Sequence, residues 1–140
     1  MENIKLREPL QNPMQTQGFG EDFQIWRNGK YVMEVFGANS LSPKANVTSL
    51  SSYSGKIDNV IFTRDGSYIN VYVNGKFEAK TAWSTPQWSS TQNTRIGWNG
   101  GTGTSYFHGL IEEVIIENCA WSASEVKKYY TYAKGRFGIL

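Results

Sequence analysis

The chain has 140 residues and a formal net charge of +2, a length that fits one domain burying roughly two-thirds of its unfolded surface. Its 14% aromatic and 19% charged residues, together with 14 glycines, are typical of a turn-rich all-β domain. The cations are scattered among glutamates, so charge alone does not indicate a nucleic-acid partner. Four cations gather near the end of an expected helix, where they complement its dipole: Lys127, Lys128, Lys134 and Arg136.

The only cysteine is Cys119, so neither an intrachain disulfide nor a cysteine-rich zinc site can form. Its apolar neighbours predict a buried, unreactive thiol. No stretch of about 18 apolar residues is present, and the first residues contain no apolar segment. We therefore expect no signal peptide and no membrane partner.

Residues 1–20 contain Pro9, Pro13 and several glutamines, and they show no hydrophobic periodicity. They are expected to form an extended N-terminal arm that packs on the domain or on a partner. Residues 21–140 form the predicted domain.

The first regular pattern is a hairpin. Residues 23–26 alternate between two faces, Asn28-Gly29 favours a tight turn, and Tyr31 to Phe36 form the return strand. Residues 38–54 are rich in serine, asparagine and proline, which predicts a long surface loop with at most one short edge strand near Val47.

A three-stranded meander is predicted next. Its strands cover residues 57–63, 68–73 and 76–79, and the last two are joined by Asn74-Gly75. On the middle strand the aliphatic residues Ile69, Val71 and Val73 share one face.

The following segment is expected to contain a polar loop over residues 82–93, a short strand over 94–98 and a flexible glycine-rich loop over 99–103. Residues 107–117 form the longest apolar stretch. Leu110, Val114 and Ile116 alternate with Ile111 and Ile115, so we predict a central strand covered on both faces.

The chain ends in a predicted helix over about residues 123–134. Ser122 and Glu125 have the spacing of a capping box, with Trp121 and Val126 at the staple positions. One face, carrying Val126, Tyr129, Tyr130 and Ala133, is expected to pack on the sandwich. Gly135 is the expected stop.

Five short segments in this order resemble the laminin-G-like branch of the concanavalin-A-like jelly rolls. They are residues 62–67, 69–76, 95–97, 107–114 and 120–126. The resemblance covers roughly residues 22–132 and departs at the start, where family members usually have further strands. It implies an all-β, antiparallel β-sandwich with one C-terminal α-helix.

Some relatives on this architecture are glycosidases, which need two carboxylates roughly 5 to 9.5 Å apart. On an extended strand Glu113 and Glu117 would lie roughly 13 Å apart, with Glu112 pointing the other way. The single histidine, His108, has no accompanying nucleophile motif. We therefore expect no enzymatic activity, with a glycoside hydrolase as the distant alternative.

The resemblance also implies calcium, which takes six or more oxygen ligands. Asp22, Asp58, Asp65 and Asn99 could contribute oxygens, with Asp22 and Asp65 the weak candidates, but no acid-dense loop is present. We expect no cofactor, and calcium is the one ion that stays open.

The candidate ligand-binding residues are mainly aromatic: Trp83, Trp88, Trp98, Asn99 and Tyr106. Trp83 and Trp88 lie in a polar loop, and the others flank or begin the glycine-rich loop, so together they could form a platform for sugar rings. The alternative is that the rings fill the edge of the sandwich.

The resulting hypothesis is a non-catalytic binding or assembly module. Residues 129–138 resemble the tail of accessory virion proteins, which implies a capsid or tail structural protein that also recognises surface glycans. The expected partners are other subunits of a homo-oligomer or larger assembly, and the expected location is a virion or an extracellular surface. A free-standing carbohydrate-binding, lectin-like module is the alternative.

Overall fold

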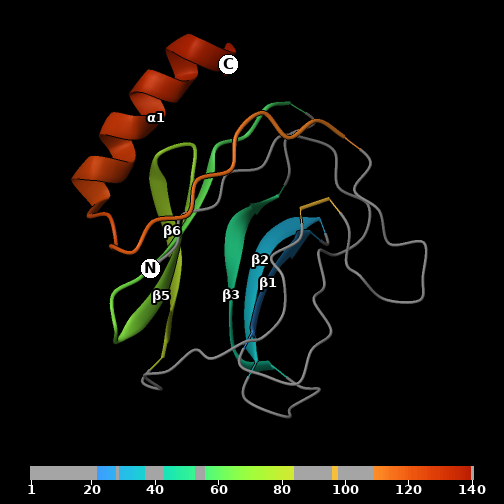
Figure 1. The fold of residues 1–140 in the computed structure, drawn as a ribbon, viewed down its shortest axis with the longest axis vertical. Helices are drawn as coiled ribbons and strands as arrows, with labels where there is room; N and C mark the ends of the chain where they lie inside the picture. The colour runs from blue at the N-terminus through green and yellow to red at the C-terminus, as the bar shows by residue number, and fades with distance from the viewer. Residues whose placement is uncertain are drawn as a thin grey trace.

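The computed structural model describes residues 22–27, 29–36, 43–52, 56–83, 96–97 and 109–139. These residues form two three-stranded antiparallel sheets that face each other, with one helix on the outer side of the second sheet (Figure 1). The elements are β1 (Asp22–Arg27), β2 (Lys30–Phe36), β3 (Pro43–Ser52), β4 (Val60–Arg64), β5 (Tyr68–Val73), β6 (Lys76–Ala82) and α1 (Ala123–Phe137). The predicted sandwich with a C-terminal helix is confirmed. The predicted arm, residues 1–20, lies outside the described residues.

The first sheet has the order β1-β2-β3. The predicted hairpin is confirmed, since β1 and β2 pair antiparallel with Trp26 opposite Val32. The prediction of a long surface loop over residues 38–54 was wrong, because β3 is a strand of 10 residues. Val47 lies on this strand and is buried in the core, so the short edge strand predicted near Val47 is part of a much longer strand.

A serine explains why this strand escaped prediction. The register of β2 and β3 shifts next to Tyr31, and there the backbone N–H of Tyr31 donates to Ser49 Oγ at 3.0 Å. The Ser49 hydroxyl donates in turn to the Ser51 carbonyl oxygen at 2.8 Å. Ser49 is therefore buried but satisfied, and a polar residue occupies a position that the hydrophobic pattern would reserve for an apolar one.

The second sheet is the predicted meander, in the order β4-β5-β6. Val73 pairs with Lys76 across the two-residue turn Asn74-Gly75, and both turn residues have positive φ, 51° and 75°. This is the backbone that Asn-Gly favours at a tight hairpin. The sequence prediction of this turn is confirmed.

The main core lies between the sheets and takes residues from both. It consists of Tyr31, Met33, Val47, Val60, Phe62, Ile69, Val71, Val73 and Trp83. A polar contact also joins the sheets. The register of β5 and β6 shifts beside Glu78, and this buried carboxylate accepts from the backbone N–H of Ser51 in β3 at 2.8 Å.

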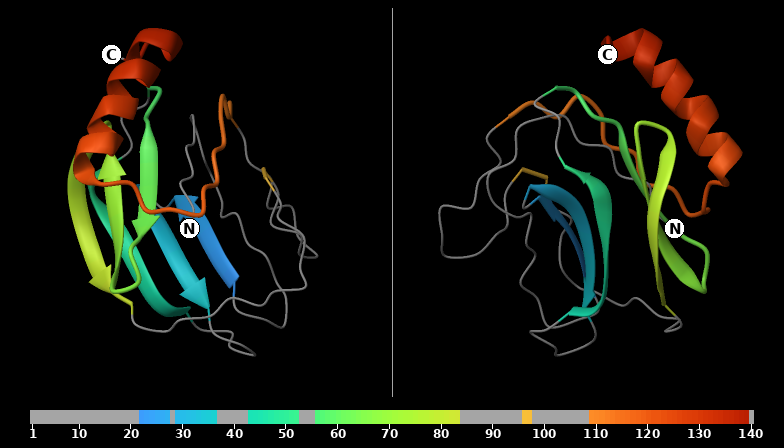
Figure 2. Two further views of the ribbon diagram at one scale, coloured as in Figure 1. Left: turned by 60° about the vertical axis from the view of Figure 1, so that its left-hand side comes forward. Right: turned by 180° about the vertical axis from the view of Figure 1, so that it is seen from behind.

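A second, smaller cluster joins the helix to the outer face of the second sheet, as Figure 2 shows from two further directions. Ile61 and Tyr72 pack there against Val126 of α1, with Trp121 and Tyr129 at the edge. Because Val60 and Phe62 face the main core, β4 is covered on both sides.

Helix α1 begins as predicted. Ser122 Oγ accepts from the backbone N–H of Glu125, and the Glu125 carboxylate accepts from the backbone N–H of Ser122 at 2.7 Å. The predicted stop at Gly135 was wrong, because the helix continues to Phe137 and ends at Gly138, whose φ is 64°. A helical glycine costs only about 1 kcal/mol relative to alanine, too little to end a packed helix.

Among the described residues, no helix combines the length and apolarity needed to span a membrane.

The predicted central strand over residues 107–117 is the main correction. No strand occurs in its described part, residues 109–117. Ile111 and Val114 both pack on the core, although alternation would place them on opposite faces. Leu110 and Ile116 are 68% and 44% exposed instead of covered. Residues 96–97 belong to the short strand predicted over residues 94–98, and they are not in a strand either.

The turn between β5 and β6 supports the first prediction. An added Cβ at Gly75 would lie 2.7 Å from a ring carbon of Tyr130 in α1, and φ is already +75°. Gly75→Ala should therefore add a steric clash of about 1–3 kcal/mol to a backbone cost of roughly 1–2 kcal/mol, as measured by urea unfolding. Gly29→Ala is the matched control, since Gly29 has φ +71° and no atom within 4 Å of the new Cβ. Equal losses in the two variants would contradict packing of the helix on the turn.

Candidate functional site

Trp83, the first predicted ligand-binding residue, belongs to the core. Its side chain is 6% exposed and packs between the sheets, with the Arg64 guanidinium 5.5 Å from its ring centroid. A buried ring cannot present a face to a sugar, so for Trp83 the packing alternative is correct. The other four predicted residues, Trp88, Trp98, Asn99 and Tyr106, lie outside the described residues.

The carboxylate of Asp65, a weak metal candidate, is hydrogen-bonded within its own turn. One carboxylate oxygen accepts from the backbone N–H groups of Ser67 and Tyr68 at 2.9 and 2.8 Å. The hydrogen bond from Ser67 contributes most to holding the pKa of Asp65 below its ordinary value. These bonds give Asp65 a role in ordering the β4–β5 turn.

Asp58 is also engaged within the fold. It is buried and accepts from the Tyr31 hydroxyl at 2.6 Å and from the Asn74 side-chain amide at 2.7 Å. For Asp22 the described part is the backbone in β1, and Asn99 lies outside the described residues. In the part of the chain that the structure describes, no three histidine, cysteine, aspartate or glutamate side chains are grouped as metal ligands.

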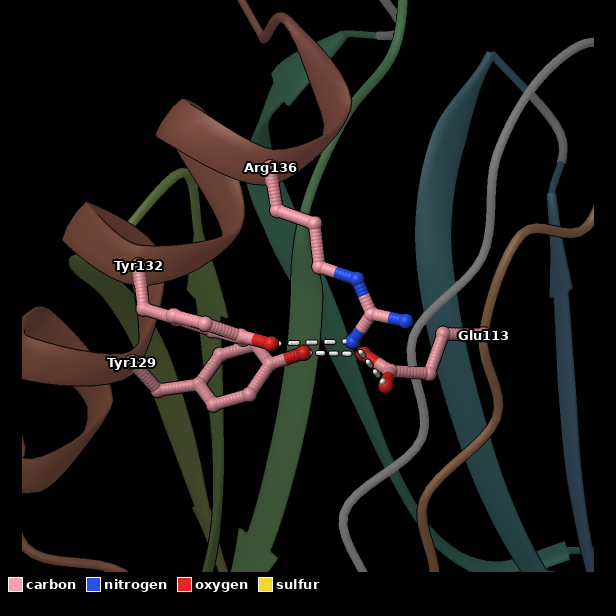
Figure 3. Close-up of polar contacts among 4 residues, drawn as sticks. All are labelled: Glu113, Tyr129, Tyr132 and Arg136. Atoms are coloured by element: carbon pink, nitrogen blue, oxygen red, sulfur yellow. Dashed lines mark hydrogen bonds and ion pairs between the residues drawn. The ribbon is translucent and has the colours of Figure 1, made fainter.

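Four side chains meet where the segment leading into α1 passes the helix: Glu113, Tyr129, Tyr132 and Arg136 (Figure 3). We call them the helix-edge cluster. The three helical members are spaced i, i+3 and i+7, which places them along one side of α1. Glu113 comes from residues 109–122 and points toward that side.

The cluster is held by hydrogen bonds between its members. The Tyr129 hydroxyl donates to Glu113 Oε2, and Arg136 Nη1 donates to the Tyr132 hydroxyl oxygen at 3.0 Å. The same nitrogen lies 3.5 Å from Glu113 Oε1. Partial burial, followed by the hydrogen bond to the Glu113 carboxylate, raises the pKa of Tyr129. The neutral tyrosine is therefore a fixed donor to Glu113.

The aromatic rings form a row along the helix. The ring centroids of Trp121 and Tyr129 are 5.2 Å apart, and those of Tyr129 and Tyr132 are 5.8 Å apart. Trp121 and Tyr129 are half-buried, whereas Tyr132 is 55% exposed. The row thus ends in an accessible ring beside a carboxylate and a guanidinium, an arrangement suited to binding a ligand with apolar and hydroxyl-bearing faces.

Two sequence inferences about this region need correction. The distance of roughly 13 Å between Glu113 and Glu117 was inferred for an extended strand. Residues 109–117 do not form a strand, so that distance does not apply. In the structure Glu113 contacts Tyr129, and Glu117 accepts from Trp121 Nε1. Cys119, predicted to be buried, is exposed.

Sequence reasoning identified Tyr129 as a packing residue and did not select Tyr132. Tyr132 falls outside the apolar period of the helix and lies four residues before Arg136. This spacing places both side chains on one exposed side of the helix, and it is a signal that could have been used. The partner Glu113 could not be found in this way, because its position depends on the fold of residues 109–122.

The second prediction concerns the bond between Tyr129 and Glu113. Tyr129→Phe should lower the free energy of unfolding by about 1 kcal/mol near pH 8, the usual net value of such a bond. Because the folded pKa of Tyr129 is raised, this contribution is fully present below the unfolded value of about 10 and is lost as pH rises through the folded pKa. Urea unfolding of both proteins from pH 8 to 12 should show the difference shrinking. Tyr132→Phe, at an exposed ring, should change stability by at most about 0.5 kcal/mol, and a pH-independent Tyr129 effect would contradict the assignment.

Comparison with known proteins agrees with this architecture. The family model described as the concanavalin A-like lectin/glucanases superfamily matches residues 10–127. No curated protein and no solved structure matches the chain. The match covers most of the 140 residues and supports a lectin-like binding module. The chain belongs to the concanavalin A-like lectin/glucanase superfamily.

Proposed function

We propose that this domain is a non-catalytic, lectin-like module that binds a glycan at the helix-edge cluster. The observation that carries the proposal is the ring of Tyr132, which is 55% exposed while its hydroxyl is held by Arg136 at 3.0 Å. A sugar ring has an apolar face of C–H groups and an edge of hydroxyls. It therefore fits an aromatic face that is bordered by hydrogen-bonding groups.

The restraint on Tyr132 matters for affinity. Ordering a flexible side chain on binding costs about 0.5–1.5 kcal/mol. Here the Tyr132 ring is already braced, because Arg136 bonds its hydroxyl and the Tyr129 ring packs edge-on at 5.8 Å. Part of the ordering cost is thus met before the ligand arrives, which favours recognition by this ring.

Binding without hydrolysis is supported by the contacts of the two carboxylates. A glycosidase needs one carboxylic acid and one carboxylate flanking the scissile bond. Glu113 is hydrogen-bonded to Tyr129 and close to Arg136, and Glu117 is hydrogen-bonded to Trp121. Both acids thus have partners that order the helix edge, so we assign them a role in shaping the site.

The third prediction tests the ring itself. Tyr132→Ala should weaken glycan binding about tenfold, equivalent to about 1.4 kcal/mol, measured by NMR titration of glycans selected on an array. Tyr68→Ala is the matched control, because Tyr68 is also an exposed tyrosine but lies on β5 and is not a member of the cluster. Loss of binding in both variants, or in neither, would reject the helix edge as the site.

A second candidate function is a structural subunit of a larger assembly, with an accessory virion protein as the setting. The observation that favours it is the exposure of Leu110 and Ile116, two large aliphatic side chains on the segment leading into α1. Apolar side chains exposed in a free subunit are often covered by a neighbour in an oligomer.

The fourth prediction tests assembly. The purified chain should form an oligomer in light scattering at about 100 μM, and the double variant Leu110→Asp with Ile116→Asp should be monomeric, because charged residues are depleted from interface cores. Leu50→Asp, at an exposed leucine on β3, should leave the oligomer intact. A monomeric wild-type chain would count against this second function.

A further inference from the structure

Arg136 is held in place from two directions. Its Nη1 atom donates to the Tyr132 hydroxyl and lies 3.5 Å from Glu113 Oε1. Its guanidinium carbon lies 4.8 Å from the ring centroid of Phe137 and 5.9 Å from that of Tyr132. These contacts use one terminal nitrogen and bring two aromatic rings close to the guanidinium, so they restrain the Arg136 side chain.

The opposite edge of the same group is formed by Nε and Nη2. No described residue accepts a hydrogen bond from Nε or Nη2 of Arg136, and the side chain is 52% exposed. Figure 3 shows the second terminal nitrogen turned away from the helix. The N–H groups of Nε and Nη2 are parallel donors that match the two oxygens of one carboxylate.

A second cation, Lys128, comes from an earlier turn of α1. Lys128 precedes Tyr132 by four residues and Arg136 follows it by four, so the three residues lie along one side of α1. Glu125 is hydrogen-bonded to Ser122 in the capping box, and this bond together with the nearby charge of Lys128 lowers the pKa of Glu125. Glu113 is bonded to Tyr129 and lies 3.5 Å from Arg136 Nη1. Each cation therefore already faces one acid, so an incoming carboxylate would be recognised by the paired donors at the Nε/Nη2 edge of Arg136 and not by excess positive charge.

We propose that the ligand of the helix-edge cluster is an acidic sugar whose ring carries a carboxylate. This inference rests on the proposed glycan-binding function and specifies its substrate class. The carboxylate binds the Nε/Nη2 edge of Arg136, and the C–H face of the sugar stacks on Tyr132. A neutral sugar would stack on the Tyr132 ring but would leave the Nε/Nη2 edge of Arg136 hydrogen-bonded to water.

The experiment compares trigalacturonic acid with its fully methyl-esterified form, which has the same sugar rings and no charge. Both are titrated into the full chain at constant ionic strength, and binding is followed by NMR shifts. The acid should bind at least tenfold more tightly than the ester. Raising the salt concentration should weaken binding of the acid more than binding of the ester. Equal affinities in the wild-type chain would overturn the inference without any variant.

Variants separate the guanidinium edge from charge alone. Arg136→Lys keeps the charge but removes the paired donors, so the preference for the acid should fall to about threefold or less. Lys134→Gln removes an exposed cation from the last turn of α1, on another side of the helix, and should leave the preference unchanged. An unchanged preference in Arg136→Lys, or an equal loss in Lys134→Gln, would overturn the inference.

The outcomes also distinguish this inference from the function on which it rests. If the ester binds as well as the acid, and both lose affinity in Tyr132→Ala, glycan binding at the helix edge stands and the acidic class is rejected. If neither ligand gives shifts that depend on Tyr132, and the array also finds no glycan, the proposed function itself fails. Equal binding of a sulfated galactose oligosaccharide that survives Arg136→Lys would show recognition of charge and would reject the carboxylate.

Discussion

Helix α1 packs on a turn that is held by hydrogen bonds around Asn74. The backbone N–H of Asn74 donates to the Asn59 carbonyl oxygen at 2.8 Å, and its side-chain oxygen accepts from the Asn59 N–H at 2.9 Å. Its side-chain nitrogen donates to Asp58, which also accepts from Tyr31 in the first sheet. Tyr130 of α1 lies directly on the turn that these bonds fix. Such contacts are directional, so they fix the turn on which the helix packs and connect it to both sheets.

The helix-edge cluster inherits its geometry from two separate anchors. The helical members are placed by packing of Val126 on the second sheet. Glu113 is placed by Ile111 and Val114, which pack on the core between the sheets. Because these anchors belong to different layers, the distance between Glu113 and Arg136 depends on how the helix and the core between the sheets are placed relative to each other. A substitution that shifts the helix would alter the cluster even if it changed none of the four side chains.

Local chemistry made parts of the fold predictable. The Asn74-Gly75 turn and the capping box at Ser122 are decided by residues within a few positions, so the sequence contains the needed information. Strand β3 and the irregular path of residues 109–117 depend on partners far along the chain. Ser49 is buried in β3 because it bonds Tyr31, 18 residues away, and hydrophobic pattern cannot reveal such a bond. The same limit applies to the site, since Tyr132 could be located on a helix face but its neighbour Glu113 could not.

The helix-edge cluster offers one exposed aromatic ring and one guanidinium, so a glycan bound there would make few contacts with each copy. A single contact of this kind would give weak attachment that is quickly reversed. Several copies displayed together would gain strength from the high local concentration of neighbouring sites, without any new contact in each copy. Such a surface would distinguish dense glycan coats from sparse ones by repetition, and the spacing between copies would matter as much as the chemistry of each one.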